Sequence, residues 1–383
     1  MAVTVTDSQT QDKAKMNKPL LDLYSDYLLS SFSLATATGL AAMVDQAYSH
    51  DQITRFLDQP RYDQKQYWQV IKPVVRQVER DDAAVLVDDT LEEKPYTDES
   101  ELVCYHYDHT QGRSVKGINL LNFVYHVTTA SGEAVSIPVS YEVVTKPELY
   151  QDPKTGKYRR RSQISKNELV RQRLKILSQS NQLRFKYVLN DIWFSSKEIM
   201  TWIKQELHKE FVMAVKDNRL VALSAADKRQ GRFVTLADLE LKPGQCRLVY
   251  FKGVSFPILV AKQVFINQDG STGTLYLASS NTSLTYDPLT TIYQKRWNVE
   301  VIHKSLKQNA ALERSPTKIM RAQCNHIFAA MVAVTKLECL KLTHQTNHFA
   351  LKSKLYLKAI KAAFAELRTL NCHSLDSVKF SSA

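Results

Sequence analysis

The sequence predicts an α/β fold in which helices flank a mixed sheet, with helical regions at both ends of the chain. Three observations support this prediction. Short apolar runs that end in aspartate alternate with amphipathic segments mid-chain, a pattern typical of parallel strands joined by helices. Three further runs alternate apolar and polar residues, as antiparallel strands do. Both ends of the chain carry apolar residues at helical spacing.

The composition favours an anionic partner. The 383 residues carry a formal net charge of +12, and clustered Lys and Arg displace counterions from phosphate backbones, so nucleic acid is the favoured partner and a merely basic protein the alternative. No run of about 18 apolar residues and no signal-peptide core is found, so we expect a cytoplasmic protein. The five cysteines are far apart, which disfavours disulfides and a zinc ribbon.

Residues 1–81 are predicted to form a helical N-terminal domain. A polar lead that looks disordered comes first. It is followed by three segments with helical periodicity: "LLDLYSDYLLSSFSLATATGLAAMVDQ", "SHDQITRFLDQ" and "YWQVIKPVVRQVER". A scaffold and a DNA-contacting bundle both remain open for this domain, because no firm helix-turn-helix signature is present.

Residues 82–217 are predicted to form the first part of the core. The run "AAVLVDDT" reads as a buried strand that ends in Asp88 and Asp89. Three hairpin-linked antiparallel strands follow in "ELVCYHYDHT", "INLLNFVYHVTTA" and "EAVSIPVSYEVV". The run "RFKYVLND" predicts a second strand that ends in Asp191. A serine-capped helix and the strand "FVMAVKD" come next, which indicates a parallel pair.

The most basic segment is "KTGKYRRRSQISKNELVRQRLKILSQS", between these strands. Its second half has helical periodicity, with Leu169, Leu174 and Leu177 on one side. Basic runs are usually solvated faces, but this one is the best candidate for a phosphate-backbone track. Its cations are Arg159, Arg160, Arg161, Lys166, Arg171 and Arg173.

The remaining chain is divided into three parts. Residues 218–270 are strand-rich, with Gly and Pro between the runs, and predict a β-rich insertion. Residues 271–331 return to the main sheet and then form a helix, for which Asp287 and Pro288 suit the N-cap and first turn. Residues 332–383 are helical by period. We expect them first to pack on the core, with dimer or DNA contacts as further options.

The stretch "YQKRWNVEVIHKSLK" places four polar residues on one side of that helix. At about 100° per residue, Tyr293, Arg296, Glu300 and Lys307 fall within an arc of roughly 60°. Apolar residues occupy the adjacent face. A salt-bridged surface helix would also give this pattern, but it would not explain the two earlier strands that end in aspartate. Three carboxylates can hold two Mg²⁺ ions for phosphodiester chemistry, with nearby cations binding phosphates.

These residues resemble a known family. "YQKRWNVEVIHKSLK" matches the Y-x(2)-R-x(3)-E-x(6)-K signature of IS4-type insertion-sequence transposases, "LVDDT" resembles their first-aspartate motif and "YVLNDIWFSS" their second. The resemblance extends from about residue 85 to residue 331. It implies an RNase H-like DDE core with a β-rich insertion, and cut-and-paste transposition of double-stranded DNA by a homodimer that uses Mg²⁺, with Mn²⁺ as a substitute. It also implies a prokaryotic protein associated with the nucleoid.

The resemblance also implies roles for individual residues. Asp88, Asp191 and Glu300 match the catalytic metal ligands, with Asp89 as the near rival of Asp88. Tyr293, Arg296 and Lys307 match the DNA-phosphate contacts. Trp297, beside them, could stack on an unpaired base, although a partly buried packing role is the better interpretation.

Two other functions fit the same residues. One is an RNase H-like nuclease that cuts without joining, and the other is a domesticated DNA-binding protein without catalysis. Three intact acids disfavour the latter. No G-x-x-x-x-G-K-[ST] loop is present, so we expect no nucleotide triphosphate cofactor.

Overall fold

The computed structural model describes residues 16–108, 111–266 and 269–370. The predicted polar lead therefore lies almost wholly outside the described residues, as does the end of the predicted C-terminal region. Four helices come first: α1 (Lys18–Ser30), α2 (Ala37–Met43), α3 (His50–Leu57) and α4 (Gln64–Val78). Side-chain caps define their starts. Ser49 and Asp63, for example, each form a capping box at the beginning of α3 and α4.

Eleven strands of the described chain form one sheet. Its central strands are β1 (Ala84–Glu93), β3 (Arg113–Thr128), β4 (Ala134–Val144), β7 (Tyr187–Asn190) and β8 (Glu210–Val215). They lie in the order β4, β3, β1, β7, β8, and the pairs β1–β7 and β7–β8 are parallel whereas β1–β3 and β3–β4 are antiparallel. The short strand β2 (Cys104–Asp108) pairs with the first residues of β3, from Arg113 to Gly117. This is the predicted mixed sheet, and the predicted fold class is confirmed.

Strand β1 is longer than the sequence predicts. We expected it to end in Asp88 and Asp89, but it continues to Glu93 because the long strand β3 pairs with it as far as Gly117. The parallel pairing with β7, in contrast, stops at Val87 opposite Asn190. The aspartates thus leave the parallel part of the sheet while remaining in a strand.

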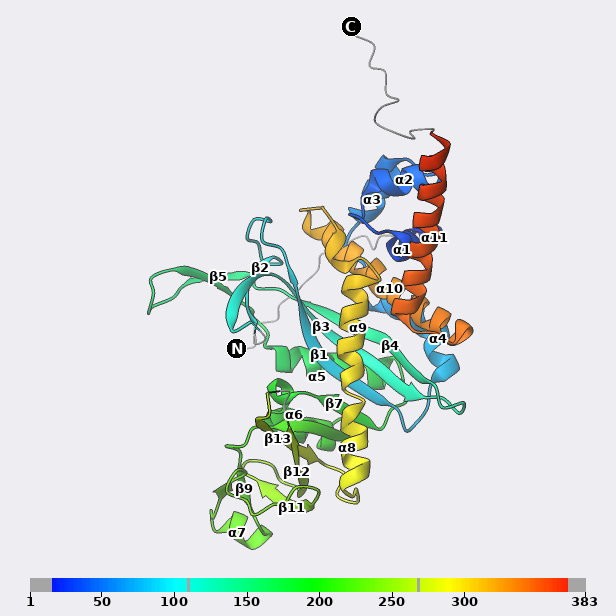
Figure 1. Cartoon of the computed structure of the whole chain (residues 1–383). Coiled ribbons are helices and arrows are strands. Elements are labelled where there is room, and N and C mark those ends of the chain that lie inside the picture. Colours follow the sequence, from blue (N-terminus) through cyan, green and yellow to red (C-terminus); the bar gives the residue numbers. More distant parts are fainter. Residues whose placement is uncertain (1–15, 109–110, 267–268, 371–383) are drawn as a thin grey trace.

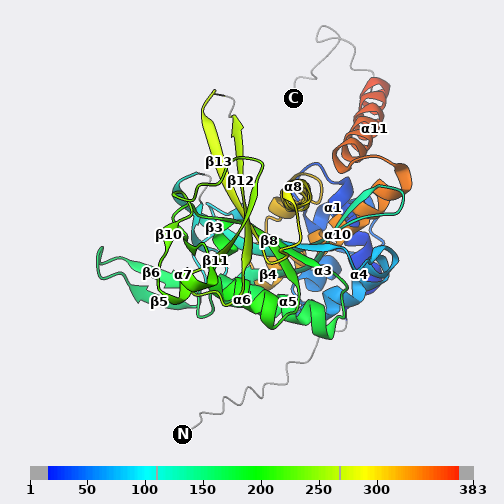
Figure 2. The same cartoon turned by 90° about the horizontal axis from the view of Figure 1, so that it is seen from below.

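The sheet continues beyond β8 through the segment after it. β13 (Thr272–Ser279) pairs with β8, β12 (Ile258–Ile266) with β13, and β11 (Cys246–Phe251) with β12. The small strands β9 (Leu220–Ala222) and β10 (Val234–Thr235) close this end, beside the short helix α7 (Ala225–Arg229). Figure 2 shows the β12–β13 hairpin projecting away from the body of the molecule.

Helices cover both faces of the central sheet. α5 (Lys166–Lys175), with a π-helical turn at Ile176–Ser180, and α6 (Lys197–Gln205) lie on one face. α8 (Tyr286–Gln294) and α9 (Trp297–Gln308) lie on the other, as Figures 1 and 2 show. Ser196 caps α6 as predicted, since its side chain accepts a hydrogen bond from the Ile199 amide. The N-cap of α8, however, is Thr285 rather than the predicted Asp287, which lies in the first turn.

The long helix α10 (Met320–His344) joins the N-terminal helices to the sheet. It is buried on nearly every side between residues 322 and 338. Asn325 illustrates the connection, because its side chain donates to the Leu57 carbonyl at 2.9 Å and accepts from the Tyr62 amide at 3.0 Å. Two short 3₁₀ turns, Ile192–Phe194 and Leu312–Arg314, complete the regular structure before α11.

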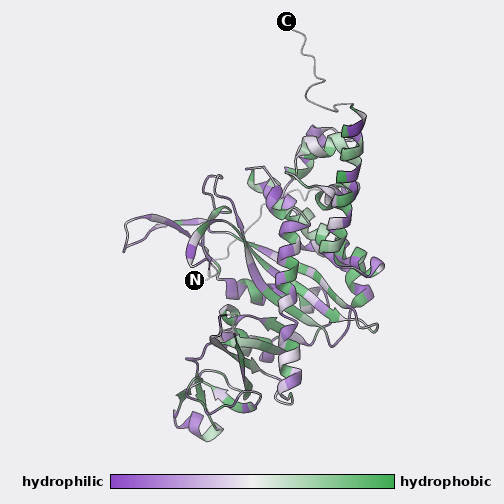
Figure 3. Cartoon of the chain, in the orientation of Figure 1, coloured by the Kyte–Doolittle hydropathy of each residue, from purple (hydrophilic) through white to green (hydrophobic). Residues whose placement is uncertain are grey.

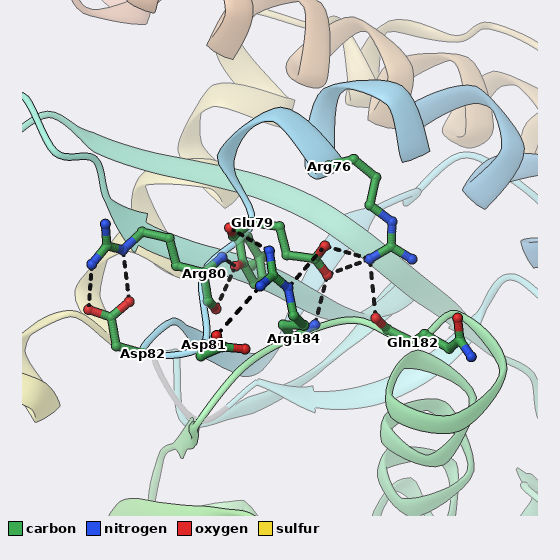
Figure 4. A network of polar contacts seen from close by, with 8 residues as sticks. Arg76, Glu79, Arg80, Asp81, Asp82, Gln182 and Arg184 are labelled. Carbon is green, nitrogen blue, oxygen red and sulfur yellow. Dashed lines mark hydrogen bonds and ion pairs between the residues drawn. The ribbon is translucent and has the colours of Figure 1, made fainter.

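A second connection is polar (Figure 4). The buried carboxylate of Glu79, just after α4, accepts hydrogen bonds from Arg76 at 2.5 and 2.6 Å and from the Arg184 amide at 2.8 Å. Arg76 also donates to the Gln182 carbonyl at 3.1 Å. Burial raises the pKa of Glu79, but the Arg184 amide and Arg76 outweigh it and hold that pKa below its usual value. The helical region and the strand that leads to Asp191 are thereby tied together.

Helix α11 (His348–Thr369) stands apart from this packing. Of its residues only His348 is buried. Several large apolar side chains on it are exposed: Leu355, Tyr356, Leu357, Ile360, Phe364 and Leu367. Simple packing, the role that we expected first for the C-terminal apolar stripe, applies to α10 and not to most of α11. Among the described residues no helix is long and apolar enough to span a bilayer.

Candidate active site

Two aspartates lie side by side where the parallel pairing of strands β1 and β7 ends. Val87 and Asn190 form the last parallel pair; Asp88 is the next residue of β1, and Asp191 directly follows the end of β7. Both line a cleft with a volume of about 640 Å³, and so do Arg296, Glu300 and Lys307. The structure therefore brings five of the predicted site residues together.

Asp88 has the environment of a carboxylate that lacks sufficient counter-charge. Burial, followed by the neighbouring Asp191 and Asp89, raises the pKa of Asp88 to about 7. Burial also raises the pKa of Asp191, although the Trp193 amide donates to its Oδ1 at 3.0 Å. Two adjacent carboxylates whose charges are both disfavoured form a site at which a cation would be stabilised.

Asp89 is occupied by other partners. Its Oδ2 accepts hydrogen bonds from Lys166 Nζ at 2.6 Å and from Asn119 Nδ2 at 2.5 Å. Burial raises the pKa of Asp89, but Lys166 and Asn119 outweigh burial, and the pKa lies below the usual value. Of the two aspartates on β1, Asp88 is the one within ion-pair distance of Arg296, whereas both interact electrostatically with Asp191.

Arg296 lies between the acids. Its Nη2 donates to Glu300 Oε1 at 2.8 Å, and its Nη1 is 3.6 Å from Asp88 Oδ2. Its Nε is buried without a hydrogen-bond partner. The backbone changes here, because Lys295 and Arg296 bond to carbonyls three residues back and separate α8 from α9. The predicted single helix is therefore two helices that follow one another, with Arg296 at their junction.

The remaining predicted DNA contacts on α8 and α9 differ in their surroundings. Lys307 Nζ donates to the Leu91 carbonyl at 2.7 Å and is 3.1 Å from Glu313. The Tyr293 ring lies 5.7 Å from the Arg296 guanidinium, and burial raises the pKa of its hydroxyl to about 12. Trp297 is 63% exposed. The interpretation of Trp297 as a partly buried packing residue is wrong, because the first residue of α9 points away from the apolar face.

The three arginines of the predicted phosphate track lie outside the cleft. Arg159, Arg160 and Arg161 form strand β6 (Tyr158–Arg161), which pairs with β5 (Glu148–Gln151). Each is near an acidic side chain: Asp152 at 3.1 Å, Glu99 at 3.6 Å and Glu148 at 2.7 Å, respectively. In α5, Arg171 and Arg173 pair with Glu168 and Glu142. The segment thus consists of a ribbon and a helix whose cations are largely paired.

Several residues of the cleft were not predicted from the sequence. Trp193, 49% exposed, lines it two residues after Asp191, with Lys216 Nζ 4.9 Å from its ring centroid. Its place inside the second-aspartate motif could have indicated it. His303 is buried and accepts from Asn122 Nδ2 at 3.0 Å, and burial lowers its pKa to about 4. No local signal in the sequence indicates that pairing, because the partner is on β3.

The carboxylates do not surround one point as they stand. In the described part of the chain, no group of three or more His, Cys, Asp or Glu side chains could hold a metal ion. The reason is visible at Glu300, whose carboxylate is paired with Arg296 and not directed at the aspartates. The donor chemistry nevertheless suits a divalent cation, since Asp88 and Asp191 offer hard oxygen ligands that are short of positive charge.

Comparison with protein families identifies this arrangement. The profile of the DDE superfamily endonucleases matches residues 9–233, more than half of the 383-residue chain. The chain belongs to the DDE superfamily endonucleases. A second profile, the transposase DDE domain, matches residues 155–335 of this DDE endonuclease. No curated protein sequence matches the chain.

Membership of the DDE superfamily accounts for the main features of the cleft. The mixed sheet of this DDE endonuclease is consistent with the RNase H-like fold, and its substrate is DNA. DDE endonucleases normally use divalent metal ions. In this chain the residues available to hold such ions are Asp88 and Asp191, with Glu300 in the lining of the same cleft.

Proposed function

We propose that this DDE endonuclease is an IS4-type transposase that cuts DNA at the ends of its own insertion sequence and joins those ends to target DNA. The observation that carries the proposal is the shared position of Asp88 and Asp191 just beyond the last parallel pair, in one cleft with Glu300. The complete four-residue signature on α8 and α9 supports the transposase assignment over a simple nuclease.

Asp88, Asp191 and Glu300 would hold Mg²⁺ ions, for which Mn²⁺ can substitute. Two such ions would activate the attacking water or 3′ hydroxyl and stabilise the leaving oxygen in line with it. The chain's own contribution is positioning. Arg296 must exchange at least one carboxylate partner for a phosphate oxygen when Glu300 turns to the aspartates. A guanidinium group forms charge-assisted hydrogen bonds with carboxylate and with phosphate oxygens alike, so Arg296 can make this exchange.

Tyr293 and Lys307 complete the proposed contacts to DNA. The Tyr293 hydroxyl remains a neutral donor at physiological pH, because burial raises its pKa to about 12. Lys307, held by the Leu91 carbonyl, places a positive charge in the lining of the cleft. Trp297 is exposed beside these residues and is available to stack on an unpaired base.

The outlying parts of the chain receive proposed roles as well. We assign DNA contacts to the helical region 1–81 and treat 82–217 and 271–331 as the two parts of the catalytic core, separated by the insertion 218–270. We assign dimer formation in the DNA complex to 332–383. Leu357, Ile360, Phe364 and Leu367 support the last assignment, because they are exposed and spaced by three and four residues along α11.

The test is cleavage and strand transfer on labelled DNA that carries the flanking ends of the gene, with Mg²⁺ or Mn²⁺. Wild type is compared with D191N and E300Q, and with E240Q as a control at an exposed acid far from the cleft lining. Cutting and joining that either site substitution abolishes, while DNA binding and the E240Q activity persist, supports the proposal. Cutting without joining would assign a nuclease. A folded, DNA-binding wild type that never cuts would assign a non-catalytic protein.

A further inference from the structure

The ribbon formed by β5 and β6 is a separate two-stranded sheet. It projects from the body of the molecule in both views, on the side opposite to α4 (Figures 1 and 2). Figure 3 shows that its residues are mainly hydrophilic. An isolated two-stranded ribbon is marginally stable in water, so a projecting one needs additional support.

The arginines supply that support. Arg161 pairs with Glu148 across the ribbon at 2.7 Å, and its guanidinium lies 5.5 Å from the Tyr150 ring centroid. Arg159 pairs with Asp152 at 3.1 Å near the tip. Arg160 holds the base, because it is 3.6 Å from Glu99 and donates to the Lys146 carbonyl at 3.4 Å. The arginines therefore brace the ribbon from within.

The tip is closed by backbone hydrogen bonds and carries two exposed cations. The Gly156 amide donates to the Asp152 carbonyl at 2.8 Å, and the Asp152 amide donates to the Lys157 carbonyl at 2.9 Å. Gly156 has a φ of 67°, which favours glycine. Lys154 and Lys157 are exposed, and neither forms an ion pair with an acidic residue of the described chain.

The base of the ribbon is connected to the cleft wall through Lys166. Ser162 Oγ donates to the Thr145 carbonyl at 2.6 Å and closes the base of the ribbon. Four residues later, Lys166 reaches Asp89 in the cleft wall. A duplex that enters the cleft therefore runs near the base of the ribbon.

We propose that the β5–β6 ribbon enters the major groove of the DNA duplex next to the cleavage site, with Lys154 and Lys157 on the phosphates. The inference rests on the proposed function. The dimensions agree: the two strands are about 4.8 Å apart, four residues extend about 13 Å, and the major groove is about 12 Å wide and 8.5 Å deep. Tyr158, 70% exposed beside the tip, would then face the groove wall.

The experiment measures duplex binding by the full chain as a function of KCl, using fluorescence anisotropy. We expect K154A/K157A to weaken binding roughly tenfold and to reduce the slope of log K against log[salt] by about 1 to 2, since each lysine releases about one counterion. K154R/K157R, which keeps both charges, should retain the wild-type affinity and slope. Lys154 and Lys157 are both exposed, so the thermal unfolding of each double variant should match wild type.

A crosslink locates the contact. A photoreactive amino acid at Thr155 should crosslink to the duplex and not to a single strand of the same sequence. Unchanged affinity and slope in K154A/K157A, or a crosslink that forms equally with single-stranded DNA, would overturn the groove assignment while the cutting activity of the wild type still stood. If the wild type neither binds nor cuts DNA, the proposed function itself fails.

Discussion

Lys166 and Asp89, far apart in the sequence, form an ion pair of 2.6 Å at the wall of the cleft. This contact distinguishes two consecutive aspartates that the sequence left as rivals. Asp89 has a cation and an amide on one oxygen. Asp88 has no cation closer than Arg296 at 3.6 Å, and it accepts one hydrogen bond, from the Asp89 backbone amide at 2.9 Å. The free energy of metal binding should therefore depend mainly on Asp88.

The first prediction compares D88N with D89N. We expect D88N to reduce metal-dependent cutting by at least about a thousandfold, as loss of a group directly involved in the chemistry does. D89N should cost roughly ten- to a hundredfold, the range for groups that orient a ligand. Titration calorimetry with Mn²⁺ should show weaker binding to D88N than to D89N. Equal losses in the two variants would contradict the assignment.

A second prediction concerns the stability of the same pair. K166M leaves the mostly buried Asp89 without its cation, so the free energy of unfolding should fall by about 1 to 3 kcal/mol. The double variant K166M/D89N should recover part of that loss, because the uncompensated charge is gone. Urea unfolding of the four proteins measures the coupling. Additive effects would show that the ion pair contributes nothing.

The third prediction is a pH dependence at His326. Its Nε2 donates to the Ala311 carbonyl at 3.0 Å and its Nδ1 accepts from the Tyr24 hydroxyl at 2.9 Å, which requires the neutral ring. Burial lowers the pKa of His326 to about 4 from 6.5. Between pH 4 and pH 6.5 the unfolded chain binds more protons at His326 than the folded chain. The stability that the neutral ring contributes is therefore fully present above pH 6.5 and is lost as the pH falls to 4.

Wild type and H326Q should differ most in unfolding free energy at pH 7.5. The difference should shrink by up to about 3 kcal/mol at pH 4, the equivalent of the pKa shift. Chemical denaturation at both pH values measures it. A difference that is the same at both pH values would mean that His326 does not titrate in this window.

The fourth prediction separates stability from DNA binding at Trp297. Because the side chain is 63% exposed, W297A should change the free energy of unfolding by less than about 1 kcal/mol. Binding to DNA with an unpaired base near the cut should weaken by about 1 to 3 kcal/mol, the range for one base stacked on an aromatic ring. W297F should restore most of the binding. A W297A variant with normal affinity would remove Trp297 from the DNA contacts.

A fifth prediction concerns α11. A chain that ends after Lys352 keeps His348, whose Nε2 is 2.7 Å from the buried Glu338, and keeps the Lys352 contacts to the Leu29 and Ser31 carbonyls. It should therefore remain folded, with a loss of at most about 2 kcal/mol for contacts such as that of Tyr356 with Phe32. Sedimentation with DNA should show that it no longer dimerises. A truncated dimer would place the interface elsewhere.

Local patterns predicted the elements of this fold well. The apolar runs of β1, β7 and β8 and the serine cap of α6 depend on neighbouring residues, which the sequence displays. The i, i+4 pair of Arg296 and Glu300 is of the same kind. Two errors are local: the N-cap of α8 is Thr285, and the predicted single helix breaks at Arg296. The other errors concern distant partners. The end of β1 is decided by β3, and the exposure of Trp297 by the packing of α9.

The cleft shows the same contrast between local patterns, which the sequence displays, and partners that are distant in the sequence. Spacing alone placed Arg296 and Glu300 on one side of a helix, but the approach of Arg296 to Asp88 depends on how that helix crosses the sheet. The ribbon arginines appeared as a run of charge, and only the strand register shows that each has an acidic neighbour. Partners of this kind cannot be read from a single sequence.

The continuity of the sheet through β8 has a practical consequence. β8 is hydrogen-bonded to β7 on one side and to β13 on the other, so the two chain segments that flank the insertion are joined by backbone pairing. A cut in the exposed turn at Lys242–Gly244 would leave Asp88 and Asp191 on one fragment and Glu300 on the other. Neither fragment would contain all three acids, so the protein could be divided into two inactive halves whose reassembly switches DNA cutting on.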